Sequence, residues 1–230
     1  MKREHREGVG MNARRIIFSG PTVRALLAGL KTQTRRVFLV PDPLGEKRAI
    51  TSPSEEIQQW ADGSFHYLST AALSGPYPCP YGQPHDLLWV RETFGCPCHN
   101  SMQPVPGCEL IYRATDEYDG DYPLSGWRQS IHMPRWASRL TLYLTGVRVE
   151  RVQEITVRDA AAEGCEWPAG AEPDAQVMGG HEFANLWESI NAKRGYPWDD
   201  NPWVWVLTFQ VIRANVDDVL SNPEKYLIIA

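Results

Sequence analysis

The 230-residue sequence lacks the features of several large protein classes. No apolar run approaches the ~20 residues that a membrane-spanning helix needs. Positive charge is not in excess, because 23 Lys and Arg stand against 28 Asp and Glu, a formal charge of −5. A protein that binds nucleic acid through bulk charge concentrates positive charge, so this composition leaves room only for a local basic pocket. Residues 1–10 are charged and have no apolar stretch, so we expect no secretory signal and a cytosolic location.

Common catalytic signatures are also missing. The sequence contains no glycine-rich phosphate loop, no Gly-x-Ser-x-Gly elbow and no histidine pair at metal-binding spacing. Five cysteines, an odd number in a chain expected in the cytosol, argue against a disulfide framework. A zinc site remains an alternative, but the usual two-residue gap between ligands is absent, and we favour unliganded loop residues at Cys79, Cys96, Cys98 and Cys108.

What the sequence does contain is typical of a globular α/β mixture. Apolar residues at helical spacing predict helices over 23–30, from Thr156 to Gly164, and over 183–190. Apolar or alternating runs predict strands at 15–18, 37–40, 86–90, 140–149 and 202–211. In the last of these we assign Trp203 and Trp205 to the core. Few helices and long loops favour an α+β fold that is more barrel-like than doubly wound.

The chain divides into three parts by composition. Residues 1–13 are expected to form a flexible leader, 14–213 one folded domain, and 214–230 a tail without a strong pattern. Two stretches inside the domain, about 41–84 and 95–134, are rich in proline, glycine and polar residues. We interpret both as insertions or long loops with little regular structure, the second interrupted by a short apolar run at 110–112.

The densest polar cluster lies directly after the first predicted helix, at Lys31, Thr32, Thr34, Arg35 and Arg36. Two hydroxyls, one amine and two guanidiniums suit a phosphate or a polar planar ligand. Cations near a helix C-terminus also complement its dipole, and periodicity alone favours that structural interpretation.

Three further side chains are candidates for a binding or catalytic role. Glu163 falls in the last turn of a short predicted helix, where the dipole disfavours an anion, and a residue that breaks a local rule is a weak indication of function. Glu92 follows a buried strand beside Arg91, where a surface ion pair is the simpler explanation. Trp136 falls in a loop and is available to stack on a base.

Six segments in order resemble an ASCH domain, of the PUA-like β-barrel superfamily. They are GLKTQTRR (29–36), HDLLWVRETF (85–94), MPRWASRL (133–140), AAEG (161–164), FANLW (183–187) and NPWVWV (201–206). The resemblance covers roughly residues 14–213, and the fuller pattern is similar to ASCH proteins encoded by tailed phages and prophages. It implies a mixed β-barrel with a few flanking helices and long loop insertions.

The resemblance also implies a site. One branch of the family, small bacterial N4-acetylcytidine amidohydrolases, uses a Gly-x-Lys-Thr-x-Thr-x-Arg stretch and a glutamate near the end of a helix. Lys31, Thr34 and Arg36 match that stretch, and Glu163 matches the glutamate. The two insertions have no counterpart in those enzymes. By this resemblance, Lys31, Thr34 and Glu163 are catalytic, and Arg36, Arg35, Glu92 and Trp136 bind substrate.

This triad predicts hydrolysis of an N4-acylated cytidine to cytidine and a carboxylate. Thr34 attacks the acyl carbonyl, Lys31 takes its proton and Glu163 positions Lys31. Arg36 or a backbone N–H supports the oxyanion, and no metal or organic cofactor is required. In an alternative assignment Thr34 only orients a water molecule.

Other classes of function fit the same residues. A non-catalytic module can use the lysine, threonine and arginine to hold RNA or a modified base. A ribonuclease can use Lys31 and Glu163 as acid and base. A phage accessory protein with a protein partner does not depend on the pocket at all. The sequence leaves the oligomeric state and the acyl group open.

Overall fold

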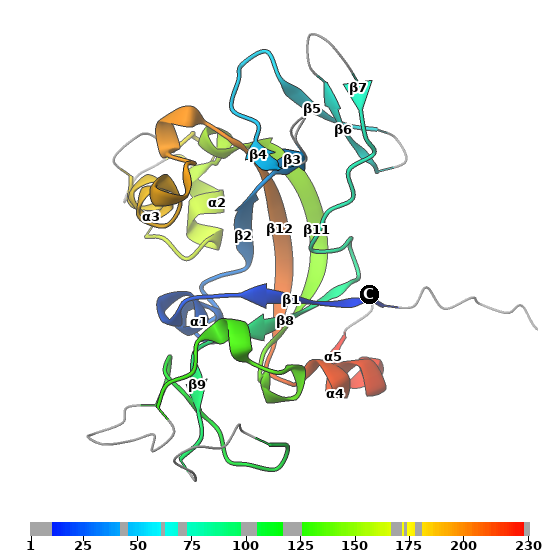
Figure 1. The fold of residues 1–230 in the computed structure, drawn as a ribbon, viewed down its shortest axis with the longest axis vertical. Helices are drawn as coiled ribbons and strands as arrows, with labels where there is room; N and C mark the ends of the chain where they lie inside the picture. The colour runs from blue at the N-terminus through cyan, green and yellow to red at the C-terminus, as the bar shows by residue number, and fades with distance from the viewer. Residues whose placement is uncertain are drawn as a thin grey trace, which may run out of the picture.

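The computed structural model describes residues 11–41, 46–60, 63–68, 73–97, 105–116, 126–166, 172, 174–177 and 181–227. Over these residues the chain has an α+β fold built on one mixed five-stranded sheet (Figure 1). Most of the predicted leader, residues 1–10, lies outside the described part, and Ala13 already begins the first strand. No described helix combines the length and the apolar character needed to cross a membrane.

The central sheet has the strand order β1-β8-β11-β12-β2. The strands are β1 (Ala13–Ile17), β8 (Leu87–Arg91), β11 (Thr141–Arg151), β12 (Trp203–Ile212) and β2 (Gln33–Val37). Only β1 and β8 pair in parallel. The strands β11 and β12 pair along almost their whole length, from Thr141–Ile212 to Arg151–Trp203, and form two long curved strands at the centre of Figure 1.

The expected barrel is not closed. The strands β1 and β2 form the two edges of the sheet, and no pairing joins them within the described ranges. The α+β class is therefore confirmed, whereas a closed barrel is wrong for this part of the chain. Apolar and alternating runs predict strands, but they carry no information on whether the outer two strands meet.

Five α-helices surround the sheet in the described residues: α1 (Gly20–Leu27), α2 (Val157–Ala162), α3 (Glu182–Asn191), α4 (Val216–Ser221) and α5 (Pro223–Tyr226). Short 3₁₀ turns are η1 (Ser130–His132), η2 (Arg135–Ala137), η3 (Val152–Glu154), η4 (Ala192–Arg194) and η5 (Trp198–Asp200). The three predicted helices are confirmed with shifted ends. For α2 the Thr156 hydroxyl caps the helix by accepting a hydrogen bond from the Asp159 N–H.

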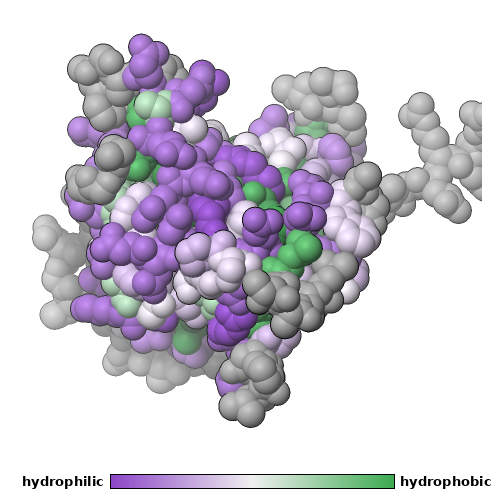
Figure 2. All heavy atoms as spheres, turned by 90° about the horizontal axis from the view of Figure 1, so that it is seen from above, coloured by the Kyte–Doolittle hydropathy of each residue, from purple (hydrophilic) through white to green (hydrophobic). Residues whose placement is uncertain are grey.

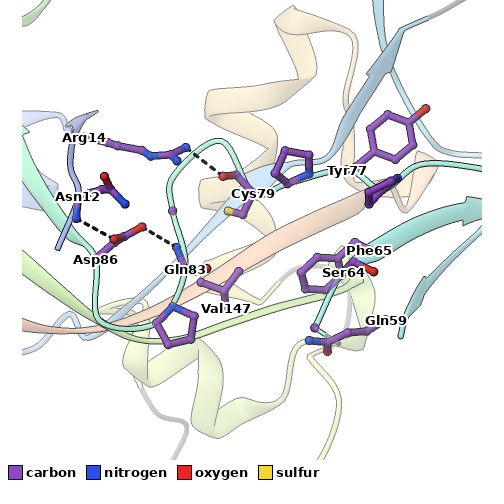
Figure 3. A pocket seen from close by; sticks show the side chains of 15 residues that line it. Asn12, Arg14, Gln59, Ser64, Phe65, Tyr77, Cys79, Gln83, Asp86 and Val147 are labelled. Atoms are coloured by element: carbon purple, nitrogen blue, oxygen red, sulfur yellow. Dashed lines mark hydrogen bonds between the residues drawn. The ribbon is translucent and has the colours of Figure 1, made fainter. Parts of the chain in front are cut away.

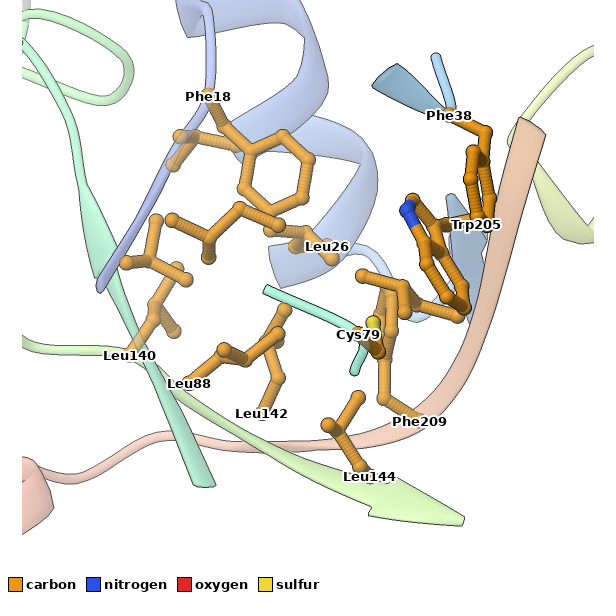
Figure 4. Close-up of a cluster of buried hydrophobic side chains, with 14 of the residues drawn as sticks. Phe18, Leu26, Phe38, Cys79, Leu88, Leu140, Leu142, Leu144, Trp205 and Phe209 are labelled. Atoms are coloured by element: carbon orange, nitrogen blue, oxygen red, sulfur yellow. The ribbon is translucent and has the colours of Figure 1, made fainter. Parts of the chain in front are cut away.

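The core lies on both faces of β12, as its alternation predicts. Leu207 and Phe209 face the cluster beneath α1, where Leu26 and Leu144 are also buried (Figure 4). Trp205, also on this face, stacks on Phe38 with ring centroids 4.5 Å apart. The opposite face is covered by α2 and α3, which bury Val204 and Val206.

The assignment of both tryptophans of β12 to the core is confirmed in full for Trp205 and in part for Trp203. Trp203 is only partly buried and packs against the edge of this cluster. Its indole N–H donates to the Glu55 carbonyl at 3.1 Å, which satisfies the polar end of the ring.

The prediction of little regular structure over 41–84 is wrong. The hairpin β3 (Leu39–Pro41) and β4 (Lys47–Ala49) begins the segment, and a second small sheet follows, with β5 (Glu56–Gln59), β6 (Phe65–Leu68) and β7 (Leu73–Ser74). Phe65 anchors this sheet by an edge contact with the Trp205 ring, 4.8 Å between centroids. Strands of two to four residues are too short for alternation to be visible in the sequence.

The second insertion is less regular, as predicted. Its described residues contain the pair β9 (Phe94–Gly95) and β10 (Ile111–Tyr112), in agreement with the apolar run expected there, followed by η1. A disulfide joins Cys96 to Cys108, so the expectation of a chain without disulfides is wrong at this pair.

The tail also differs from prediction, because α4 and α5 pack against the outer end of the sheet. Val216 and Val219 are fully buried against Leu87 and Trp89 of β8. Asn215 fixes this contact. Its side-chain oxygen caps α4, and its amide donates to the carbonyls of Arg135, Trp136 and Ser138 at 2.8–3.2 Å. Helices of six and four residues are too short to show periodicity.

Replacing Asn215 by Ala is expected to lower the free energy of unfolding by about 1–2 kcal/mol, because it removes a helix cap and the amide that ties α4 to η2. Urea denaturation measures this. Ser221→Ala, at an exposed position in α4, is the control and should change stability by less than ~0.5 kcal/mol. Equal stability of Asn215→Ala and wild type would show that the tail does not dock as described.

Candidate functional site

A cavity of about 220 Å³ lies at the β2 edge of the sheet, between β2, α3 and the segment that contains Tyr81. Lys31, Thr34 and Arg36 line it from the β2 side, and Glu163 lines it from the end of α2. In Figure 1, α2 and α3 lie together beside β2. The polar cluster that the sequence placed after a helix is thus largely part of a strand, since β2 begins at Gln33.

Lys31 and Glu163 form a buried ion pair, with each side chain 5% exposed. The Lys31 ammonium donates to Glu163 Oε2 and also to the Glu163 carbonyl, at 2.9 Å. Two of its three N–H groups are therefore satisfied by one residue 132 positions away. Among the described residues no other group accepts from the third N–H, so it is available to a ligand in the cavity that Lys31 lines.

Local backbone geometry brings the two residues together. Gly164 has a φ of +93° and follows Glu163, the last residue of the turn that ends α2. A Cβ at this position would lie 3.4 Å from Ala25 Cβ and 3.6 Å from Lys31 Cβ, which is ordinary van der Waals contact, so it is the left-handed conformation that favours glycine here. The Thr32 N–H donates to the Ala162 carbonyl at 2.8 Å and fixes the same junction.

All the hydrogen-bond donors of Arg35 have acceptors within the protein. Its side chain is 1% exposed, and its five N–H groups make five hydrogen bonds. The acceptors are Glu150, Gln33, Glu163 and Asp159, at 2.6–3.2 Å. Arg35 was expected to bind substrate, but this bonding leaves no N–H for a ligand, and its role here is to orient Glu163.

A third cation completes the ionic network on its outer side. Arg148, on β11, donates to Glu150 Oε2 at 3.0 Å and to Asp159 Oδ2 at 2.8 Å. Three cations and three carboxylates are thus joined in one network, in which Lys31, Arg35 and Glu163 are the deeply buried members. A balanced network of this kind satisfies the buried charges that would otherwise be costly.

Thr34 lies on β2, opposite Leu207 of β12, and is almost fully buried. It lines the cavity, and its hydroxyl makes no hydrogen bond to another described residue. In particular, no hydrogen bond joins it to Lys31. Within the described ranges Thr34 therefore has a hydroxyl that is available to a ligand.

Arg36 lies on the opposite side of β2 from Arg35 and has different partners. Its Nη2 donates to the Ile17 carbonyl at 2.9 Å, and its guanidinium lies over the Phe18 ring, 5.0 Å from the centroid. Burial lowers the pKa of Arg36, and nearby Arg194 acts in the same direction, whereas Tyr81 and Glu163 raise it. No described carboxylate forms an ion pair with Arg36.

The sequence did not predict that Tyr81 and the α3 wall form part of this cavity. Tyr81 comes from the first insertion, where no pattern distinguishes it, and burial raises its pKa, an effect that Arg36 opposes. The far wall is α3, from which Phe183, Leu186 and Ile190 line the cavity. These three were predicted only as the apolar face of a helix. Leu186 and Ile190 are each 42% exposed, so this face does not pack entirely into the core.

Glu92 and Trp136 do not line this cavity. Glu92 is buried and accepts two hydrogen bonds from Arg139, at 2.9 and 3.0 Å. Burial raises its pKa, which the Arg139 guanidinium opposes. Trp136 lies in η2 and packs beside Phe94 and Met133. The structure therefore separates these two predicted binding residues from Lys31, Thr34 and Glu163.

A second cavity, of about 700 Å³, is lined by Cys79 (Figure 3), whereas Tyr81, two residues further along the chain, lines the smaller cavity. Its two charged side chains already have backbone partners. Arg14 donates to the carbonyls of Cys79 and Pro80, and Asp86 accepts from the N–H groups of Asn12 and Gln83. This larger cavity contains none of the predicted site residues.

The described cysteines do not form a metal site. Cys96 and Cys108 are bonded to each other, and Cys98 lies outside the described residues. Burial raises the pKa of Cys79 to about 11 and that of Cys165 to about 12, so both remain protonated thiols at neutral pH. No group of three potential metal ligands occurs within the part of the chain that the structure covers.

Comparison of the chain with models of protein families, with curated protein sequences and with solved structures gives no match. Support for a functional site here therefore comes only from the positions and contacts of the described residues.

Replacing Glu163 by Gln is expected to lower the free energy of unfolding by about 3–5 kcal/mol, because it leaves two buried cations, Lys31 and Arg35, without their shared carboxylate. The matched control is Asp174→Asn, which makes the same change in an exposed pair with Arg158 and should alter stability by less than ~1 kcal/mol. Denaturant titration of both variants gives the comparison. A loss for Glu163→Gln as small as that of the control would show that the buried pair is not formed.

Proposed function

We propose that this chain is an ASCH-type amidohydrolase that removes the acyl group from an N4-acylated cytosine nucleoside. The observation that carries the proposal is the convergence of Lys31, Thr34 and Glu163 on one cavity, although Glu163 is 132 residues from Lys31 in the chain. A purely structural ion pair would need only Lys31 and Glu163. It would not explain why the buried Thr34 hydroxyl, which has no hydrogen-bond partner among the described residues, lines the same cavity. The order of the sequence segments and the α+β fold support a PUA-like assignment.

The size of the cavity favours a small flat group. At about 220 Å³ it is smaller than the ~300–1,000 Å³ typical of pockets for drug-sized ligands. A single pyrimidine ring with its acyl group suits this volume, with the sugar at the mouth. The apolar side chains of α3, Leu186 and Ile190, offer a surface for one face of the ring.

The first half of the proposed reaction forms an acyl-enzyme. Glu163 takes a proton from the Lys31 ammonium, and the resulting amine takes the Thr34 hydroxyl proton as the oxygen attacks the acyl carbon. The Thr34 O–C bond forms and the C–N4 bond breaks, while Lys31 returns the proton to N4. The Tyr81 hydroxyl lines the cavity without a hydrogen bond to another described residue and is available to the acyl oxygen.

The second half releases the acid. Water attacks the Thr34 ester, Lys31 takes its proton and returns it to the threonine oxygen as the ester C–O bond breaks. The released acid gives its proton to bulk water and leaves as a carboxylate, and Glu163 returns its proton to Lys31, which restores the starting ion pair. Arg35 does not touch the substrate in this scheme, and it holds Glu163 toward Lys31. If Thr34 only orients water, the same pair activates that water directly and no ester forms.

Wild-type protein is expected to release cytidine from N4-acetylcytidine, and chromatography measures the cytidine formed. Lys31→Met should lower kcat/KM by ~10²–10⁴-fold, the usual contribution of a general acid–base group. Circular dichroism of each variant establishes that it is folded. No cytidine from folded wild-type protein would exclude this reaction, and RNA cleavage that Lys31→Met abolishes would replace it with a ribonuclease.

The role of the hydroxyl is tested separately at residue 34. Thr34→Ser keeps the nucleophilic oxygen and should retain appreciable activity, whereas Thr34→Ala should lose it. Thr32→Ala is the matched control, because Thr32 is an exposed threonine two residues away and should leave kcat unchanged. Full activity in Thr34→Ala would contradict both the nucleophilic and the water-orienting role.

A further inference from the structure

The cavity contains more positive charge than the ionic network neutralises. Its lining includes four cationic side chains, Lys31, Arg35, Arg36 and Arg194, and a single carboxylate, Glu163. The oxygens of Glu163 are taken by Lys31 and Arg35. Arg36 and Arg194 are therefore left as cations without a carboxylate partner among the described residues, in a protein whose formal charge is −5.

Arg36 is held in place, but most of its N–H donors have no hydrogen-bond acceptor among the described residues. The Ile17 carbonyl and the Phe18 ring hold one side of its guanidinium, which uses only one of its five N–H groups in hydrogen bonds to described residues. A partly buried guanidinium in this position keeps its charge at neutral pH. Its remaining donors are available to a ligand in the cavity.

Arg194 approaches the same cavity from the opposite wall. It is the last residue of η4, which continues α3, and Gly195 ends this turn with a φ of +86°. Arg194 is exposed and makes no ion pair with a described carboxylate. It is also close enough to Arg36 to lower the pKa of that group, although burial is the larger cause.

Two guanidiniums on facing walls repel each other unless an anion lies between them. Arginine presents paired N–H donors that match phosphate oxygens, and charge-assisted bonds of this kind are about twice as strong as neutral ones. A purely neutral nucleoside would leave both cations uncompensated. The exposed apolar residues of α3, Leu186 and Ile190, lie on the same wall as Arg194 and suit the base.

We propose that the cavity binds a nucleoside monophosphate, with the phosphate held between Arg36 and Arg194. This inference rests on the proposed function for the identity of the base, and it changes the substrate from an N4-acylated cytidine to its monophosphate. It also gives Arg36 a phosphate to bind, in place of the oxyanion that Arg36 or a backbone N–H was expected to support. The attraction of the two arginines for phosphate acts only within the cavity, so it is compatible with the formal charge of −5 of the whole chain.

Binding of the unacylated products tests this without any turnover. Isothermal titration calorimetry on wild-type protein should give cytidine 5′-monophosphate a Kd at least ~10-fold below that of cytidine, and this difference should shrink as KCl is added. Arg194→Gln should remove the preference and leave the cytidine affinity unchanged. Lys193→Gln is the matched control, because it removes one exposed cation from the adjacent position, which does not line the cavity.

The outcomes separate the two proposals. Equal affinities for the nucleoside and its monophosphate, or an unchanged preference in Arg194→Gln, would overturn the phosphate site even if N4-acetylcytidine is hydrolysed. An arginine-dependent preference in a protein that hydrolyses nothing would support the phosphate site and refute the amidohydrolase. A short oligoribonucleotide that binds more tightly than the monophosphate, with the same dependence on Arg194, would overturn the mononucleotide in favour of RNA.

Discussion

The carboxylate of Glu163, shared between Lys31 and Arg35, is the interaction on which this site depends. It joins the end of α2 to the segment that leads into β2, and these come from distant parts of the chain. Because the charges are buried, losing any one of the three would leave an unpaired charge that costs several kcal/mol. Because Lys31 and Glu163 also line the cavity, the pair that stabilises the fold lies beside the space that a ligand would occupy.

Successive side chains of β2 point to opposite faces of the sheet, and this separates two groups of site residues. Gln33 and Arg35 point toward the ionic network, which holds Glu163 in place, whereas Arg36 points toward Phe18. The two adjacent arginines therefore differ: all the N–H donors of Arg35 bind protein acceptors, whereas Arg36 uses one N–H in bonds to described residues. The first insertion adds Tyr81 to the cavity, so an element outside the segments that carry the resemblance shapes the ligand space.

The sequence predicted the elements with strong local patterns. The apolar face of α1, the cap at Thr156 and the alternation of β12 all lie where expected. The short strands around Phe65 and the helices after Asn215 were missed, because packing against distant residues stabilises them rather than local periodicity. The hydrogen bonds of Arg35 were not foreseen for a related reason: its partner Glu150 lies on β11, and spacing along β2 carries no information about a neighbouring element.

We propose that Lys31 and Glu163 act as one unit in catalysis, and a double-mutant cycle tests this most directly. Lys31→Met, Glu163→Gln and the double variant would be compared with wild type by kcat/KM for N4-acetylcytidine, with unfolding measured in parallel. Strong non-additivity is expected, in which Lys31→Met costs little further activity once Glu163 is Gln. Losses that simply multiply, or a folded wild type that releases no cytidine, would contradict it.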